Sequence, residues 1–116
     1  MIKTKSVYDP AEPTDRDRFL VSRYWPRGIS KERLRLTCWL RELAPSVQLL
    51  RDWKDGRISW EEYTRRYHQE MSDQQDRIAE LAERSRSATI TLICVEREED
   101  PHCHRHLLKG LIEAEK

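Results

Sequence analysis

The sequence predicts an α/β fold, with a small parallel or mixed sheet flanked by helices in a single compact domain over residues 1–116. Short apolar runs typical of strands stand near the start and near the end of the chain, and several helical stretches lie between them. Strands separated by helices are typical of α/β architectures. A chain of 116 residues also has the length of one domain.

The first quarter of the chain predicts two strands. Residues 2–8 alternate weakly between apolar and polar side chains, which indicates a strand with one solvated face. Residues 9–15 contain the Pro, Asp and Thr that are typical of a loop. The apolar run 19–22 predicts a second, buried strand, and Pro26 and Gly28 then interrupt regular structure.

Helical periodicity dominates the middle of the chain. The first helix is expected to bury one face and to end at Pro45. Ser46 is expected to cap the next helix, and Ser59 to open a third through a capping box with Glu62. A fourth helix follows it. The apolar positions of these helices are Leu36, Trp39, Leu40 and Leu43 in the first, Trp60, Tyr63, Tyr67 and Met71 in the third, and Ile78, Leu81 and Ala82 in the fourth.

The last third of the chain contains the clearest strand and a final helix. Residues 88–95 form an apolar, β-branched run without charges, which is typical of a strand covered on both faces. Asp100 is expected to cap the last helix, with Pro101 in its first position.

A candidate site is predicted where two strands end. In open α/β sheets, ligands bind beyond the carboxyl ends of the strands. If strands 19–22 and 88–95 are parallel neighbours, the turn 23–28 and the segment 96–105 meet at one edge of the sheet. The residues expected there are Arg23, Trp25, Arg27, Glu96, Cys103, His104 and Arg105.

The predicted roles follow from charge and helix geometry. Three arginines around a helix start, with Trp25 beside them, predict a clamp for a phosphate or carboxylate; they are Arg23, Arg27 and Arg105. Glu96, His104 and Cys103 are the candidate catalytic residues, because a helix N-terminus lowers the pKa of a nearby thiol and favours neutral imidazole. We expect binding of a small anionic ligand, phosphate- or nucleotide-like in chemistry, and a hydrolase or transferase activity is compatible with these residues.

Two alternative functions stay open from sequence. The same residues could form a structural network in a non-enzymatic interaction protein, or Cys103 could be a redox thiol. A metal site is a weaker, third option: Cys94, His102, Cys103, His104 and His106 are residue types that bind metals, but no Cys-x-x-Cys occurs and helix periodicity turns His102 and His106 to solvent. No metal or cofactor is therefore predicted. Cys94, in the buried strand, and Cys38, in a helix, are expected to be inert core thiols.

Composition narrows the classes of partner. The 22 basic and 21 acidic residues give a net charge of +1, without the basic excess that non-specific nucleic-acid binding needs. No apolar run predicts a signal peptide or a membrane span, so a cytoplasmic location and no membrane partner are expected. Charged and hydrophobic residues each make up 37% of the chain, which indicates a modest core that a homodimer could support.

Three motifs are specific enough to suggest a family. They are Tyr8-Asp9-Pro10, Arg23-Tyr24-Trp25-Pro26-Arg27-Gly28, and the run Trp-Leu-Arg-Glu-Leu-Ala-Pro-Ser at residues 39–46. With them the chain resembles the YeaO-like family, the domain of unknown function 488. Cys94-Val95-Glu96 and Cys103-His104-Arg105 are similar to a late pattern of that family. The resemblance implies a compact α/β domain and no particular reaction.

Overall fold

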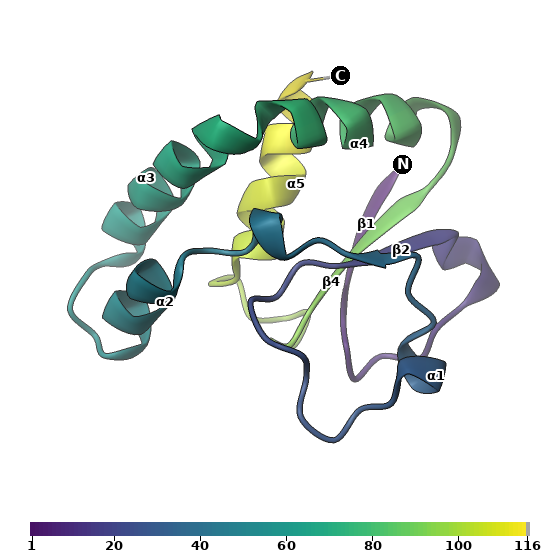
Figure 1. Cartoon of the computed structure of the whole chain (residues 1–116), viewed down its shortest axis with the longest axis horizontal. Helices are drawn as coiled ribbons and strands as arrows, with labels where there is room; N and C mark the ends of the chain where they lie inside the picture. The colour runs from purple at the N-terminus through teal and green to yellow at the C-terminus, as the bar shows by residue number, and fades with distance from the viewer. Residues whose placement is uncertain (116) are drawn as a thin grey trace.

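A computed structural model describes residues 1–115, which contain a four-stranded sheet with every strand pair parallel (Figure 1). The strand order is β1-β4-β2-β3. The strands are β1 (Ile2–Ser6), β2 (Asp17–Leu20), β3 (Cys38–Trp39) and β4 (Ile90–Cys94). The predicted α/β class and parallel sheet are therefore confirmed.

The helices of residues 1–115 lie between these strands or after the last of them. They are α1 (Lys31–Leu34), α2 (Val47–Lys54), α3 (Trp60–Met71), α4 (Gln75–Ser87) and α5 (His104–Glu115). Three short 3₁₀ turns occupy Pro13–Asp15, Arg41–Leu43 and Ser72–Gln74. Within this part of the chain, no helix combines the length and the apolar character needed to cross a bilayer.

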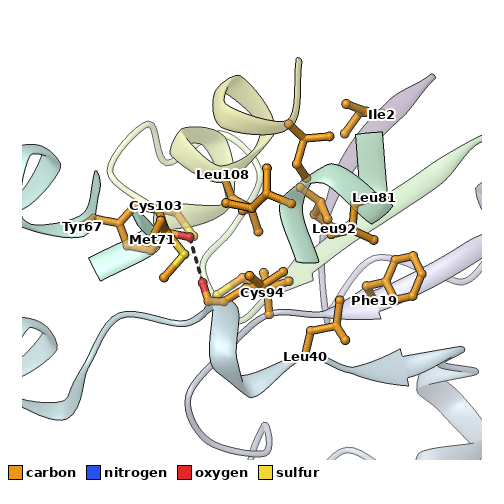
Figure 2. Packing of buried hydrophobic residues seen from close by; sticks show 14 of the residues in the cluster. Ile2, Phe19, Leu40, Tyr67, Met71, Leu81, Leu92, Cys94, Cys103 and Leu108 are labelled. Atoms are coloured by element: carbon orange, nitrogen blue, oxygen red, sulfur yellow. Dashed lines mark hydrogen bonds between the residues drawn. The ribbon is translucent and has the colours of Figure 1, made fainter. Parts of the chain in front are cut away.

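The longer helices cover one face of the sheet. Because side chains alternate along a strand, Leu92 and Cys94 of β4 point to the same face. On that face they join a core with Tyr67 of α3 and Leu108 of α5 (Figure 2). The Tyr67 hydroxyl donates a 2.8 Å hydrogen bond to the carbonyl of Leu43, which ties α3 to the segment before α2. The buried helix faces were predicted correctly for α3 and α4.

The other face of the sheet carries a smaller apolar cluster. Ile93 of β4 and Leu20 of β2 pack there with Leu34 of α1. α1 is only four residues long, and its N-terminus is capped by Ser30, whose hydroxyl accepts from the amide of Arg33 at 3.1 Å. Covered by helices on one face and by α1 on the other, β4 is fully buried, as its charge-free sequence predicts.

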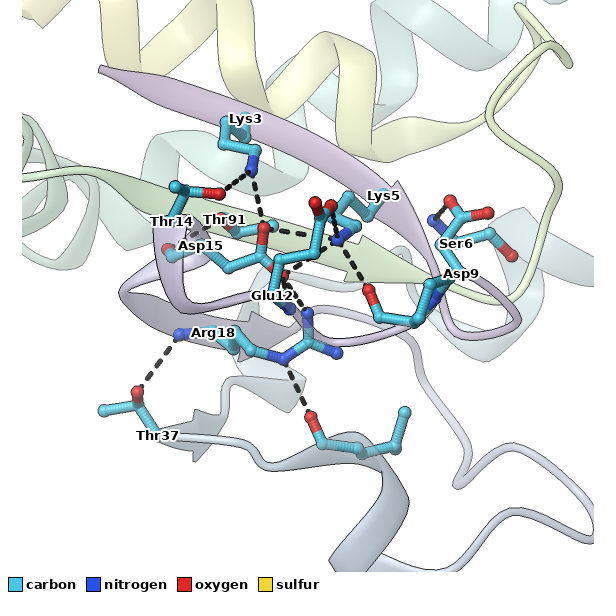
Figure 3. Close-up of polar contacts among 12 residues, drawn as sticks. Lys3, Lys5, Ser6, Asp9, Glu12, Thr14, Asp15, Arg18, Thr37 and Thr91 are labelled. Carbon is cyan, nitrogen blue, oxygen red and sulfur yellow. Dashed lines mark hydrogen bonds and ion pairs between the residues drawn. The ribbon is translucent and has the colours of Figure 1, made fainter.

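A buried ion network lies beside that cluster (Figure 3). Asp15 is 0% exposed, and its carboxylate pairs with three cations. Lys3 Nζ lies 2.6 Å from Oδ1, while Lys5 Nζ and Arg18 Nη1 lie 2.9 and 2.5 Å from Oδ2. The Thr91 hydroxyl of β4 also donates to the carbonyl of Asp15 at 2.8 Å. The network therefore joins β1, β2 and β4 to the 3₁₀ turn between the first two strands.

The helix predicted over residues 36–43 is wrong. Its backbone instead pairs with β2, because the amides of Thr37 and Leu40 donate to the carbonyls of Arg18 and Leu20, both at 2.8 Å. These bonds replace the i−4 bonds that a helix requires. Cys38, expected in a helical core, is consequently exposed on the edge strand β3.

The predicted helix starts of α2 and α3 are confirmed. Ser46 and Ser59 are the N-caps, and each hydroxyl accepts from the backbone amide three residues on at 3.1 Å. The capping box of α3 is only half formed, because the Glu62 carboxylate pairs with Arg65.

The predicted start of the last helix is wrong by several residues. α5 begins at His104, and Asp100 lies in the turn before it. There the Asp100 carboxylate accepts from the amide of His102 at 2.9 Å. An Asp-Pro pair favours a turn as much as a helix start, and in this structure Asp100 lies in a turn.

Candidate functional site

The predicted meeting of two strand ends is confirmed. β2 pairs with β4 in parallel, with Leu20 opposite Ile93. The amide of Val21 continues this pairing by donating to the carbonyl of Ile93 at 2.9 Å. The turn after β2 and the segment after β4 therefore leave the sheet at the same edge, where α/β sheets bind ligands.

A pocket of about 350 Å³ lies at this edge. Residues of the turn after β2, the end of α2, α3 and the segment after β4 line it. Six of the seven residues predicted for the site are among them: Arg23, Trp25, Arg27, Glu96, Cys103 and His104. The structure therefore brings together side chains that stand up to 81 positions apart, since 104 − 23 = 81.

The buried end of the pocket contains two thiols and a carboxylate. The Oε2 atom of Glu96 lies 3.1 Å from Cys94 Sγ and 3.3 Å from Cys103 Sγ, so it can accept from either thiol. Both cysteines are buried, and Cys103 is 2% exposed. Cys94 was expected to be an inert core thiol, whereas it lines the pocket beside Glu96.

The two thiols differ in acidity. A hydrogen bond from the Cys94 thiol, with a further contribution from His104, lowers the pKa of Cys103 to about 6 despite its burial. The same contact between the thiols, together with burial, raises the pKa of Cys94. Burial alone would raise the pKa of Glu96, but hydrogen bonds from Cys94, its own backbone amide and Cys103 lower it.

His104 is held by the backbone directly after β2. Its Nε2 atom lies 2.7 Å from the carbonyl oxygen of Val21, so Nε2 carries a proton and donates. Its Nδ1 atom lies 4.0 Å from Cys103 Sγ. The Tyr67 ring packs 5.6 Å away from the imidazole. The imidazole is thus fixed in orientation, with Nδ1 directed towards the thiols.

The turn after β2 forms the outer part of the pocket. Arg23 donates to the carbonyl of Pro45 from Nε at 3.0 Å and from Nη2 at 2.9 Å, so half of its guanidinium is committed to the backbone. Trp25 donates to the carbonyl of Ile29 at 2.8 Å. Arg27 is exposed and makes no ion pair within residues 1–115.

Arg105 lies outside the pocket, contrary to prediction. It is 0% exposed, and its guanidinium donates to three backbone carbonyls. Nη1 reaches Lys5 at 2.8 Å and Cys94 at 3.3 Å, and Nη2 reaches Arg97 at 2.7 Å. It also pairs with Glu98 at 3.4 Å. Arg105 therefore fixes the ends of β1 and β4 and the loop that carries Glu96.

Trp53, Lys54 and His102 are among the pocket residues that were not predicted from sequence. Lys54 ends α2, and Trp53 precedes it. His102 was expected to face solvent, and it is exposed, but its ring also packs 5.6 Å from Trp53 and 4.8 Å from Trp60. The helix periodicity used for His102 does not apply, because α5 begins two residues later. Only the apolar spacing of α2 could have indicated from the sequence that Trp53 is partly buried beside the pocket.

Comparison with known proteins identifies the family. The model described as "Active DUF488-N3 subclade" matches residues 2–116. This chain belongs to the YeaO-like DUF488 family. It is 35% identical over 92 residues to "Uncharacterized protein YeaO" of Escherichia coli K12, which covers 79% of this chain and 80% of that protein. It is 32% identical over 97 residues to "Uncharacterized protein Rv3073c" of Mycobacterium tuberculosis H37Rv, covering 83% and 80%. No solved structure matches it significantly.

Most motifs of this DUF488 protein meet at the pocket, whereas Tyr8-Asp9-Pro10 does not line it. Arg23 to Arg27 form its outer part, and Cys94, Glu96, Cys103 and His104 form its buried end. The motif at residues 39–46 supplies the Pro45 carbonyl that holds Arg23. The family resemblance and the pocket thus concern the same residues.

Proposed function

We propose that this DUF488 protein binds a small anionic ligand, phosphate- or nucleotide-like in chemistry, in the pocket beyond β2 and β4. One observation carries the proposal. Arg27 and Lys54, which form no ion pair within residues 1–115, line the same pocket as the buried group of Glu96, Cys103 and His104.

The charges at the outer part of the pocket favour an anion. Arg27 and Lys54 are exposed. Arg23 bonds to the backbone through Nε and Nη2, and its Nη1 makes no such bond. A guanidinium fork and an ammonium on facing segments suit the oxygens of a phosphate. The free cysteines within residues 1–115 are compatible with a reducing compartment, and we infer a cytoplasmic location.

The aromatic walls favour a ligand that also carries a flat ring. Trp25, Trp53 and Tyr24 line the pocket together with the cations and the buried group. Aromatic side chains stack on nucleobases without selecting one of them. A phosphate held by Arg27 and Lys54 with a ring against these walls is the arrangement that a nucleotide would adopt.

The buried end supplies groups for a reaction on such a ligand. Glu96 can accept a proton, and Cys103 beside it is a nucleophile when ionised. Transfer of a group from the ligand to water or to a second substrate would make the protein a hydrolase or a transferase.

Replacing Arg27 by Ala tests anion binding. Thermal shift and calorimetry with inorganic phosphate, nucleotides and sugar phosphates should find a ligand that raises the melting temperature of the wild type. Arg27→Ala should weaken that ligand by roughly 10-fold or more, since a hydrogen bond to a charged group contributes about 1.5–3 kcal/mol.

Arg86→Ala is the matched control, because Arg86 is exposed on α4 and pairs only at the surface, with Glu83 and a backbone carbonyl. This variant should bind as the wild type does. If no anion raises the melting temperature of the wild type, or if both variants lose affinity equally, the proposal is wrong.

A second candidate is a non-enzymatic interaction protein in which the charged residues have structural roles. The placement of Arg105 favours it, because that arginine contacts backbone and Glu98 and lines no part of the pocket. The anion screen separates the two candidates, since only the first expects a ligand. A redox role for Cys103 stays a prediction.

A further inference from the structure

The buried end of the pocket gathers three groups that bind transition metals. Cys94 Sγ, Cys103 Sγ and a ring nitrogen of His104 all lie within 4.8 Å of one another, and all three residues are buried. They come from the end of β4 and the start of α5, nine and ten positions apart. Sequence spacing gave no hint of this cluster, because the turn between Cys94 and Cys103 follows no metal-binding pattern.

The orientation of His104 suits a metal ligand. Since Nε2 donates to the carbonyl of Val21 at 2.7 Å, the lone pair of the ring is on Nδ1, which faces Cys103. Histidines that bind metals almost always donate their other ring N–H in this way, which fixes the tautomer and the ring plane.

Glu96 lies beside the two sulfurs, outside the group of three residues whose ligand atoms all lie within 4.8 Å of one another. Its Oε2 lies 3.1 and 3.3 Å from the two sulfurs, and the carboxylate forms no ion pair with any Lys or Arg of residues 1–115. Two thiols and an imidazole lone pair thus lie together, with a carboxylate beside the thiols. No Lys or Arg side chain of residues 1–115 neutralises that carboxylate through an ion pair.

The distances match a tetrahedral site after small shifts. With Zn–S bonds near 2.3 Å and Zn–N or Zn–O bonds near 2.0–2.2 Å, neighbouring ligand atoms lie roughly 3.5–3.8 Å apart. Glu96 Oε2 lies 3.1 and 3.3 Å from the two sulfurs, Cys103 Sγ lies 4.0 Å from His104 Nδ1, and the ligand atoms of Cys94, Cys103 and His104 all lie within 4.8 Å of one another. The pocket gives an ion a path from solvent to these atoms.

We propose that Cys94, Cys103 and His104 bind a Zn²⁺ ion, with Glu96 able to complete the tetrahedron or to yield its position to a ligand in the pocket. Two thiolates and an imidazole are a donor set that selects zinc over the harder Mg²⁺ and Ca²⁺. The inference rests on the buried cluster and not on the anion binding proposed for Arg27 and Lys54.

Cobalt titration tests this site without any assay of activity. Co²⁺ in a tetrahedral thiolate site absorbs in the visible and, through sulfur-to-metal charge transfer, in the near ultraviolet. Protein stripped with EDTA and kept reduced should show both absorptions on addition of Co²⁺, and Zn²⁺ should abolish them. Cys94→Ser and Cys103→Ser should each lose at least half of the charge-transfer absorption, because each variant removes one of the two sulfur ligands.

Cys38→Ser is the matched control, because Cys38 is exposed on β3 and is not part of the cluster. It should keep the full spectrum, as should Arg27→Ala. Absence of the spectrum in the wild type, or a charge-transfer absorption in Cys103→Ser as strong as in the wild type, would overturn the proposal. Cys103 lies in the loop before α5, so this variant decides the matter even if Cys94→Ser, in β4, fails to fold.

Discussion

Replacing Asp15 by Asn is expected to lower the free energy of unfolding by about 3–5 kcal/mol, the cost of breaking a buried ion pair from one side. The neutral amide would leave Arg18 as a buried cation without a carboxylate and Lys5 with the Glu12 carboxylate alone. That is a large part of the roughly 5–15 kcal/mol by which a domain is usually stable.

The same variant should change how stability depends on pH. Burial alone would raise the pKa of Asp15, but hydrogen bonds from Lys3, Lys5, the amide of Glu12 and Arg18 hold it well below its ordinary value. A carboxyl with a depressed folded-state pKa adds stability above its unfolded pKa of about 3.9, and that stability is lost as the pH falls below it. Asp15→Asn should therefore show a weaker loss of stability between about pH 4 and pH 2 than the wild type.

Urea denaturation over that pH range measures both effects, with Asp17→Asn as the control. Asp17 is two residues away and pairs with Arg84 at 3.1 Å, but both side chains are partly exposed. Exposed pairs contribute about 0–1 kcal/mol, so the control should lose little. If both variants lost the same free energy of unfolding, burial of Asp15 would not be the reason for the stability that its ion pairs contribute.

The fold could be predicted from the sequence where a hydrophobic pattern is compatible with only one kind of secondary structure. The charge-free run 88–95 predicted a central strand, and β4 is buried between β1 and β2. The apolar spacing of Leu36, Trp39, Leu40 and Leu43 fitted a helix, but a short edge strand followed by a 3₁₀ turn buries Leu40 and Leu43 equally well. Pairing with β2 decided between them, and that pairing is a long-range property.

The position of the site could be predicted from the sequence, but the set of side chains that line it could be predicted only in part. The rule that ligands bind beyond strand ends placed the turn 23–28 beside Glu96 and Cys103. The rule does not say how the segment between β4 and α5 folds, and this segment decides which side chains reach the pocket. It brings Cys94 to Glu96 and turns Arg105 away.

Arg105→Lys is expected to lower the free energy of unfolding by about 3 kcal/mol or more, because each buried acceptor left without a partner costs about 1–3 kcal/mol. One guanidinium now serves the carbonyls of Lys5 and Arg97, and it adds a second bond at the Cys94 carbonyl, which also accepts from the amide of Val7 at 2.9 Å. The single ammonium of lysine cannot reach three carbonyls in a plane. Arg105→Met, of similar length and without donors, should cost at least as much.

Urea denaturation measures this loss, and ligand affinity shows whether Arg105 acts directly. If Arg105 only positions other groups, Arg105→Lys should bind the anion that contacts Arg27 with an affinity within about 3-fold of the wild type. That change is smaller than the tenfold that corresponds to about 1.4 kcal/mol. An arginine that contacted the ligand would instead lose affinity with little loss of stability. The ratio of the two effects therefore separates the structural role, to which its burial points, from the binding role expected from sequence.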